Sequence, residues 1–194
     1  MIKIIKKKKG KTALTARAIA EELGVSTQPI FTCFHTMEEA EEEVYKAAEK
    51  LFHEYTLKGI QEKIPFLGFG MQYIRFAREE PELYRMLFLE KRDEKHGALE
   101  EMYYSQKLVR DSLKQIYRIG EEEADRYFRD MWLVVHSLAT LIVTSGCPYP
   151  DKEIGDILSG FSISMCKAIK EIPGFISGEY DKDAIFRDLI TKER

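Results

Sequence analysis

Apolar residues recur at intervals of three and four positions along most of the 194-residue chain, and no stretch shows a sustained alternation of apolar and polar residues. Spacing of this kind places apolar side chains on one face of a helix, whereas a half-buried strand needs the two-residue alternation. Glycine and proline fall between the periodic stretches, where they separate one helix from the next. The pattern therefore predicts an all-α protein.

The same periodicity predicts a series of helices after residue 35. The first covers about residues 36–57, and the next two begin at Pro65 and Pro81. A charged loop at 90–97 is expected before three long helices at about 98–118, 121–145 and 151–171, and a short amphipathic piece follows at 184–190. The core faces of the first three are predicted to be Ala40, Val44, Ala47, Ala48, Leu51 and Tyr55; Phe66, Phe69, Tyr73, Phe76 and Ala77; and Leu83, Met86 and Leu87.

The most apolar run, residues 131–143, is shorter than the roughly 20 residues that cross a bilayer. We therefore expect it to form a buried or interface helix. No apolar stretch follows the N-terminal lysines, so a secretory signal is not expected. Three cysteines without paired spacing suit a reducing compartment. Together these features predict a cytoplasmic protein.

Charge is distributed unevenly, although the formal net charge is only -3. Residues 1–35 contain seven Lys or Arg and two Glu, which gives +5, so the rest of the chain must carry -8. A basic end on an acidic body is the expected charge pattern of a protein that places only that end on nucleic acid.

Residues 14–34 carry the signals of two short helices joined by a tight turn. Thr15 is a good N-cap for the first helix, and Gly24 suits the left-handed residue that ends it. Ser26 is predicted to cap the second helix, where Pro29 is tolerated in the first turn. The expected shared core consists of Ile19, Leu23, Val25, Ile30 and Phe34, beside the small Ala20. This arrangement predicts a helix-turn-helix.

The second helix must present its other side to solvent if Ile30 and Phe34 face inward. The outward residues are then Thr27, Gln28, Phe31, Thr32 and His35. Polar side chains on such a helix reach base edges and phosphates in a major groove, and we expect Gln28 to contact a base. Lys6–Lys9, Lys11 and Arg17 are candidates for attracting the DNA backbone. A purely structural helical hairpin and a solvated lysine-rich chain end are the alternatives.

Residues 13–40 resemble the DNA-binding segment of the TetR family of bacterial repressors. The matching positions are Thr15, Arg17, Ile19, Ala20, Gly24, Val25, Ser26, Phe31 and Phe34, followed by Thr36 with Glu39 as a capping box. Residues 132–143 also look like the penultimate helix of some members. Three positions depart from the pattern: Gly10 follows a short first segment, Phe31 stands where Tyr is frequent, and Met37 stands where Lys is frequent.

The resemblance implies a three-helix DNA-binding domain at residues 1–42 and a helical ligand-binding and dimerisation domain at residues 43–194. It implies three partners: double-stranded DNA, a second copy of the chain bound through the last two long helices, and a small-molecule effector that releases a repressor from a near-palindromic operator. The residues expected to contact DNA are Thr15, Arg17, Ser26, Thr27, Gln28, Phe31, Thr32 and His35.

Aromatic and methionine residues at helical spacing in the larger domain suggest either a core or an apolar ligand pocket with a few polar tips. His136 is the polar residue of most interest because it lies within an apolar run. The candidate ligand-binding residues are Phe69, Tyr73, Phe76, Met102, Tyr103, Trp132 and His136.

Metal-binding and catalytic patterns are not found. The four histidines are scattered, and the sequence has no paired-cysteine spacing, glycine-rich phosphate loop or nucleophile elbow. We therefore expect no enzymatic activity, no metal and no cofactor. The rival hypothesis is a helical dimer that binds a small molecule or a protein without touching DNA.

Overall fold

A computed structural model of the chain describes residues 1–8, 14–90 and 97–191. These residues form helices and connecting turns without any strand, so the all-α prediction is confirmed. The helices are α1 (Ile2–Lys8), α2 (Ala16–Leu23), α3 (Gln28–Cys33), α4 (Met37–Ile60), α5 (Pro65–Glu79), α6 (Pro81–Tyr84), the π-helix η2 (Arg85–Leu89), α7 (Ala98–Tyr117), α8 (Glu121–Thr144), α9 (Asp151–Glu171) and α10 (Lys182–Thr191).

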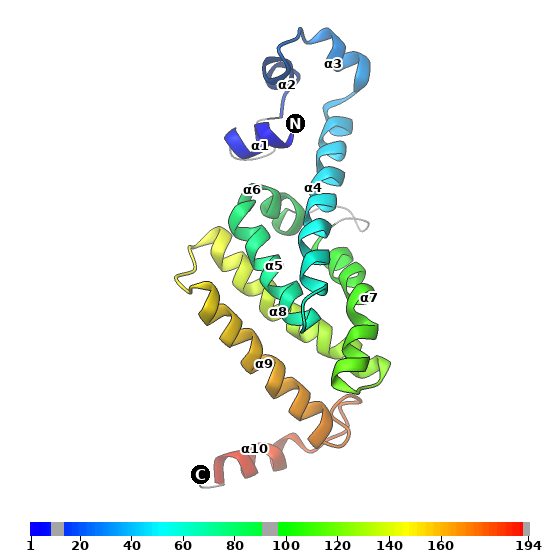
Figure 1. Cartoon of the computed structure of the whole chain (residues 1–194), viewed down its shortest axis with the longest axis vertical. Coiled ribbons are helices and arrows are strands. Elements are labelled where there is room, and N and C mark those ends of the chain that lie inside the picture. Colours follow the sequence, from blue (N-terminus) through cyan, green and yellow to red (C-terminus); the bar gives the residue numbers. More distant parts are fainter. Residues whose placement is uncertain (9–13, 91–96, 192–194) are drawn as a thin grey trace.

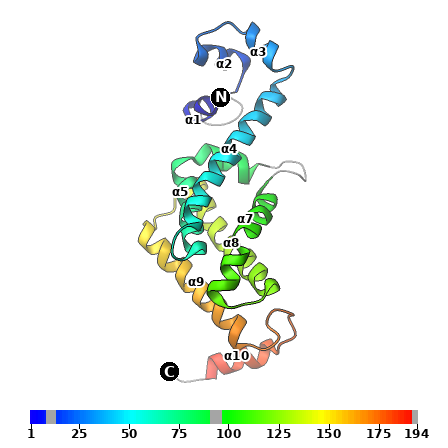
Figure 2. The same ribbon diagram turned by 45° about the vertical axis from the view of Figure 1, so that its right-hand side comes forward.

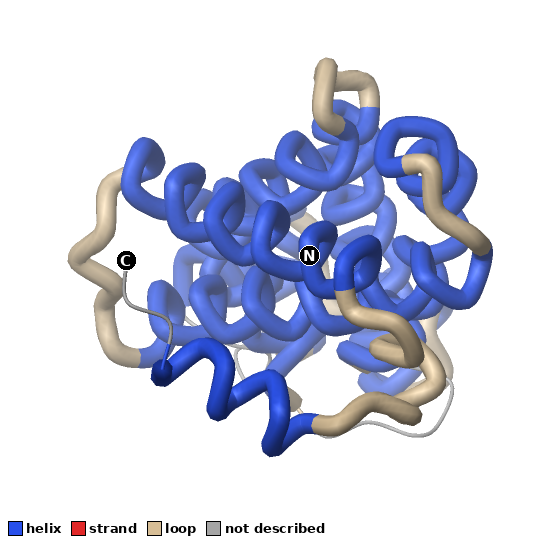
Figure 3. The backbone as a smooth tube through the Cα atoms, turned by 90° about the horizontal axis from the view of Figure 1, so that it is seen from below, coloured by secondary structure: helices blue, strands red, loops and turns tan. Residues whose placement is uncertain are grey.

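The short helices α1, α2 and α3 form a small lobe at one end of an elongated molecule (Figure 1). Helix α4 leaves this lobe and runs into a larger bundle of α5 to α9, while α10 lies at the opposite end (Figures 1 and 2). The view from below shows the long helices stacked beside one another (Figure 3). Because α4 spans residues 37–60, it passes without a break through the domain boundary predicted near residue 42.

An aromatic core fills the bundle. All four aromatic residues of the predicted α5 stripe, from Phe66 to Phe76, are buried, as are Leu83, Met86 and Leu87 of the next segment. Phe52 of α4 meets Tyr73 edge to face, with ring centroids 5.2 Å apart. Burying each such side chain contributes about 1.5–3 kcal/mol, so this cluster is a large part of the stabilisation of the bundle.

The buried face of α4 differs from the predicted one. Ala47 is exposed and Leu51 and Tyr55 are only partly buried, whereas Tyr45 and Phe52 are fully buried. The sequence offers two adjacent apolar rows on this helix, and periodicity alone does not choose between them. The choice follows from the position of α5, which packs along the row that contains Phe52.

Two glycines let α4 and α5 cross at close range. A Cβ atom added at Gly59 would lie 2.3 Å from the carbonyl oxygen of Gly68, and one added at Gly68 would lie 2.1 Å from the carbonyl oxygen of Gly59. These separations are far below van der Waals contact. The backbones can therefore touch here only because both residues lack a side chain.

The three long C-terminal helices lie close to their predicted bounds. Residues 131–143 fall within α8, where most of the apolar side chains are buried, as expected. The predicted loop at 90–97 falls almost entirely outside the described residues. Helix α10 contains the predicted amphipathic piece but buries none of its side chains. Among the described residues, no helix is long and apolar enough to span a membrane.

Gly59→Ala should destabilise the protein by about 1–3 kcal/mol, because the added methyl group would force α4 and α5 apart. Gly155→Ala is the matched control, since its Cβ would meet only the sulfur of Met71 at 4.0 Å. Denaturant-induced unfolding measures the free energy of unfolding of both variants. Equal stability of the two variants would contradict the tight crossing.

Candidate nucleic-acid interface and interior polar cluster

The predicted turn between α2 and α3 is present. Thr15 Oγ1 accepts a hydrogen bond from the amide of Ala18 at 3.1 Å, which caps α2. Gly24 has φ of 69°, in the left-handed region, and the amide of the following residue, Val25, donates to the carbonyl of Ala20 at 3.0 Å. These two ends fix the length of α2 and turn the chain toward α3.

The start of α3 differs from the prediction. The helix begins at Gln28, and its N-cap is Thr27 rather than Ser26, with no side-chain hydrogen bond to the helix. Thr27 already has helical backbone angles, so its hydroxyl is not placed to accept from the first-turn amides. Pro29 lies in the first turn, as predicted.

The core of the small lobe is smaller than expected. Ile19, Ala20 and Ile30 are buried and Phe34 is partly buried, as predicted. Leu23 and Val25, by contrast, expose 63% and 46% of their surface, so their assignment to the core is wrong. Three helices of at most eight residues have too little volume to cover every side of α2, and α1 covers the side facing Ile4 and Ile5.

All the side chains predicted to contact DNA are exposed: Thr15, Arg17, Ser26, Thr27, Gln28, Phe31, Thr32 and His35. On α3, the hydroxyl of Thr32 donates to the carbonyl of Gln28 at 3.1 Å, an ordinary bond within the helix. The amide of His35 donates to Glu39 Oε2 at 2.8 Å, and the hydroxyl of Thr36 accepts from the amide of Glu39. The predicted cap at Thr36 is therefore present, but the carboxylate reaches back to residue 35.

The basic charge of the small lobe is partly paired. Lys6 forms an ion pair with Glu80, at the junction of α5 and α6, and Lys7 pairs with Glu22 at 3.1 Å. Arg17 contacts Glu21 at 3.0 Å and is 86% exposed. Lys9 and Lys11 of the predicted basic cluster lie outside the described residues. The cations of α1 and α2 that remain accessible are therefore fewer than the sequence count indicates.

An acidic run marks the start of α4, directly after α3. Its carboxylates line a surface hollow of about 720 Å³ together with Cys33 and Phe34. The carboxylates in this lining are Glu38, Glu39, Glu42 and Glu43. Lys46 also lines this hollow, but the net negative charge of the hollow disfavours a polyanion there.

A polar network lies within the aromatic core, centred on His136 of α8. Its Nδ1 lies within hydrogen-bond distance of the hydroxyls of Tyr73, at 2.9 Å, and Tyr84, at 3.1 Å, and its ring stacks on Trp132 with centroids 4.7 Å apart. The hydroxyl of Tyr84 also lies 3.1 Å from Thr140 Oγ1.

Burial sets the ionisation of this network. It lowers the pKa of His136 below its ordinary value, because the charged imidazolium loses its hydration. Burial likewise raises the pKa of Tyr84 to about 12 and that of Tyr73 well above its ordinary value. All three side chains are therefore neutral near pH 7.

Other polar side chains of the interior were absent from the sequence-based site. The imidazole of His53 on α4 lies 2.9 Å from the carboxylate of Glu101 on α7, which is only 5% exposed. Trp132 Nε1 and Ser105 Oγ are buried and have no hydrogen-bond partner among the described residues. Glu101 is not among the site residues predicted from the sequence. No local pattern signals that it meets a histidine 48 positions away.

The predicted ligand-binding residues fall into two groups. Aromatic contacts link Phe69, Phe76 and Trp132 to Tyr73, directly or through Phe52, beside His136. Tyr103 is instead 48% exposed and lines an outer hollow of about 530 Å³ with Met102. It does not join the interior cluster.

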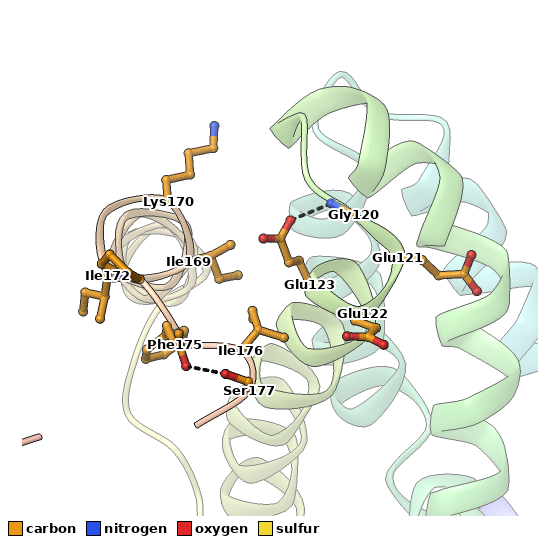
Figure 4. A pocket seen from close by; sticks show the side chains of 12 residues that line it. Gly120, Glu121, Glu122, Glu123, Ile169, Lys170, Ile172, Phe175, Ile176 and Ser177 are labelled. Atoms are coloured by element: carbon orange, nitrogen blue, oxygen red, sulfur yellow. Dashed lines mark hydrogen bonds between the residues drawn. The ribbon is translucent and has the colours of Figure 1, made fainter. Parts of the chain in front are cut away.

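Another surface hollow, of about 700 Å³, lies between the start of α8 and the segment that follows α9 (Figure 4). Its walls combine the glutamates of the first turn of α8 with Ile169, Phe175 and Ile176 (Figure 4). None of the predicted ligand-binding residues lines it. Among the described residues, no group of three or more His, Cys, Asp or Glu is arranged to hold a metal ion.

Helices α8 and α9 carry several exposed apolar side chains. Leu133, Leu141, Phe161 and Ile163 expose between 47% and 61% of their surface. Helix α9 buries only Ile154, Leu158 and Ile169 over its 21 residues. Exposed large apolar side chains that gather on a surface are typical of interfaces between protein chains.

Comparison with known families gives one match. The tetracycline repressor-like C-terminal domain model matches residues 66–158, which run from the start of α5 into α9. No curated protein matches the chain. The matched segment lies entirely outside α2 and α3, so it is independent of the helix-turn-helix pattern that resembles the same family. These two parts of the sequence agree, and together they support assignment of the chain to the TetR family of bacterial transcriptional regulators.

Proposed function

We propose that this regulator is a homodimeric repressor that binds a near-palindromic operator through α3 and is released from it by a small molecule. The observation that carries the proposal is the exposure of Thr27, Gln28 and Thr32 on a helix whose inner side is anchored by Ile30. An outward polar face on the second helix of a helix-turn-helix fits the major groove.

The exposed residues divide into two roles in this proposal. Gln28 contacts a base, because an amide presents a donor and an acceptor side by side. Thr15, Arg17, Ser26 and His35 surround α3 and contact the phosphate backbone, together with the hydroxyl of Thr27. Phosphate contacts position the protein without selecting a sequence.

Dimerisation through α8 and α9 is supported by the exposed apolar side chains of these helices. Packing the two helices against their counterparts in a second copy removes exposed apolar surface, including that of Leu133 and Ile163, from water. A twofold arrangement of this kind presents two recognition helices to major grooves about 34 Å apart, which selects a near-palindrome.

The effector site is proposed to be the cluster of Tyr73, Tyr84, Trp132 and His136. An incoming ligand that accepts a hydrogen bond would satisfy Trp132 Nε1, which has no partner within the described residues. Phe52 places α4 against this cluster, and α4 continues to the end of α3. Displacement of α4 would therefore change the spacing of the recognition helices, and DNA would weaken effector binding by the same factor.

The rival function is a helical dimer that does not bind DNA, and the acidic start of α4 favours it. Gel-shift with the DNA upstream of the chain's own gene separates the two. Binding at low salt supports the repressor, and failure to bind at low salt supports the rival.

Gln28→Ala should weaken binding to the operator by about 1–3 kcal/mol and leave binding to unrelated DNA unchanged. Arg17→Ala should weaken binding to the operator and to unrelated DNA alike. It should also reduce the magnitude of the slope of log affinity against log salt concentration by about 1. Fluorescence anisotropy titrations at several salt concentrations measure these effects. If both variants lost the preference for the operator over unrelated DNA to the same extent, the assignment of Gln28 to a base and Arg17 to a phosphate would be contradicted.

Ile163→Glu should weaken self-association by roughly 30-fold or more, because it places an unpaired charge in the proposed interface. Leu189→Glu on α10 is the matched control, since that leucine is similarly exposed, at 69% compared with 61% for Ile163. Analytical ultracentrifugation measures the dissociation constant. A dimer that is equally stable in both variants would show that α9 is not the interface.

Lowering the pH should destabilise the protein through His136. Its pKa in the folded chain lies below the ordinary value of about 6.5 that it regains on unfolding, so the unfolded state takes up the proton first. The free energy of unfolding should therefore fall as the pH drops through about 6.5, and His136→Gln should remove that part of the loss. Denaturant titrations at several pH values measure the free energy of unfolding. The same pH dependence in the unmodified protein and in His136→Gln would contradict the prediction.

A further inference from the structure

Helix α3, the proposed recognition helix, exposes no cationic side chain. Its sequence is Gln28-Pro29-Ile30-Phe31-Thr32-Cys33, and all of these residues except Ile30 are exposed. Guanine presents two acceptors in the major groove, which Arg or Lys most commonly contacts. A helix without either residue lacks the usual means of selecting G·C pairs. Its base preference must come from an amide and from apolar groups.

Gln28 is the amide available for a base. Its side chain is exposed and makes no hydrogen bond within the described part of the chain, so it need not break an internal contact to reach DNA. Its oxygen accepts and its nitrogen donates, which matches the N6 donor and N7 acceptor of adenine. Gln28 is therefore suited to adenine.

Phe31 is 58% exposed on the same helix. It has no polar atom, so it makes no conventional hydrogen bond to a phosphate or a base. The C5-methyl group of thymine is the main apolar group on the major-groove edge of the bases, and burying Phe31 against it removes apolar surface from water. The hydroxyl of Thr32 donates to Gln28, which leaves the methyl group of this threonine available for a similar contact.

We propose that each half of the operator contains an A·T step read by Gln28 on adenine and by Phe31 on a thymine methyl. The three-residue separation of these side chains corresponds to about 4.5 Å along the helix, slightly more than the 3.4 Å between base pairs. The two bases are therefore in adjacent or next-adjacent pairs. This inference rests on the proposed function and adds the bases that the helix selects.

The neighbouring polar residues do not supply the missing guanine contact. Arg17 lies on α2 and is paired with Glu21, while His35 lies beyond the end of α3 with its amide bonded to Glu39. Both positions flank the helix and suit the phosphate contacts proposed above. The base-reading set is therefore confined to Gln28, Phe31 and the methyl group of Thr32.

Selection of binding sequences from a random duplex library with the full-length protein tests the base preference. The expected result is a pair of half-sites, each with adenine and thymine fixed at adjacent or next-adjacent positions. Half-sites fixed as G·C at those positions would overturn the inference while leaving DNA binding established. Failure to bind any duplex at low salt would remove the proposed function and this inference together.

Base analogues in the selected operator then test each contact. Replacing the adenine with 7-deazaadenine removes N7 and should weaken binding roughly fivefold to 100-fold. Replacing the thymine with uracil removes only the methyl group and should weaken binding several-fold. Unchanged affinity for either substituted operator would overturn the corresponding contact without any change to the protein.

A thermodynamic cycle assigns the methyl contact to one side chain. Phe31→Ala should bind the thymine and uracil operators equally, because the apolar partner of the methyl group is gone. Leu23→Ala is the matched control: this leucine is 63% exposed but lies on α2, so the variant should keep the full preference for thymine. Both residues are exposed, so neither change opens a cavity in the core. A thymine preference retained by Phe31→Ala would overturn the assignment.

Discussion

A helix of six residues cannot hold a fixed orientation by itself, because isolated helices of this length are unstable in water. The direction of α3 is therefore set by its surroundings: Gly24 turns the chain, Ile30 anchors the inner side, and the cap at Thr36 joins α3 to α4. Everything proposed about DNA depends on this constraint, because it decides that Thr27, Gln28 and Thr32 face away from the protein. In the proposed function, the major groove supplies the partner of this exposed face.

Helix α4 connects this constraint to the rest of the molecule. One end is fixed to the small lobe, and the other is held in the aromatic core by Phe52 and by the close approach of Gly59 to α5. The ion pair between Lys6 and Glu80 joins the same two parts by a second route. An effector that repacks the cluster around His136 would thus act on α3 through a packed helix. The neutral, buried state of that cluster favours an uncharged ligand.

The sequence was sufficient where a local rule decides the structure. The cap at Thr15, the left-handed Gly24, the start of α5 at Pro65 and the apolar stripe of α5 all follow from nearby residues alone. It was insufficient where distant packing decides. The exposure of Leu23 depends on what α1 leaves uncovered, the buried face of α4 depends on α5, and the His53–Glu101 pair depends on the docking of α7. The residues predicted to contact DNA lie on the surface, while Tyr103 lies apart from the interior cluster.

Placement of α3 in the major groove is the central claim, and Cys33 offers a direct measurement because its thiol is exposed on that helix. An iron chelate attached to Cys33, with Cys147 and Cys166 replaced by serine, cleaves DNA near its point of attachment. The account predicts two groups of cuts centred on major grooves about 34 Å apart on the operator. Cuts spread evenly along the duplex, or centred on one minor groove, would contradict it.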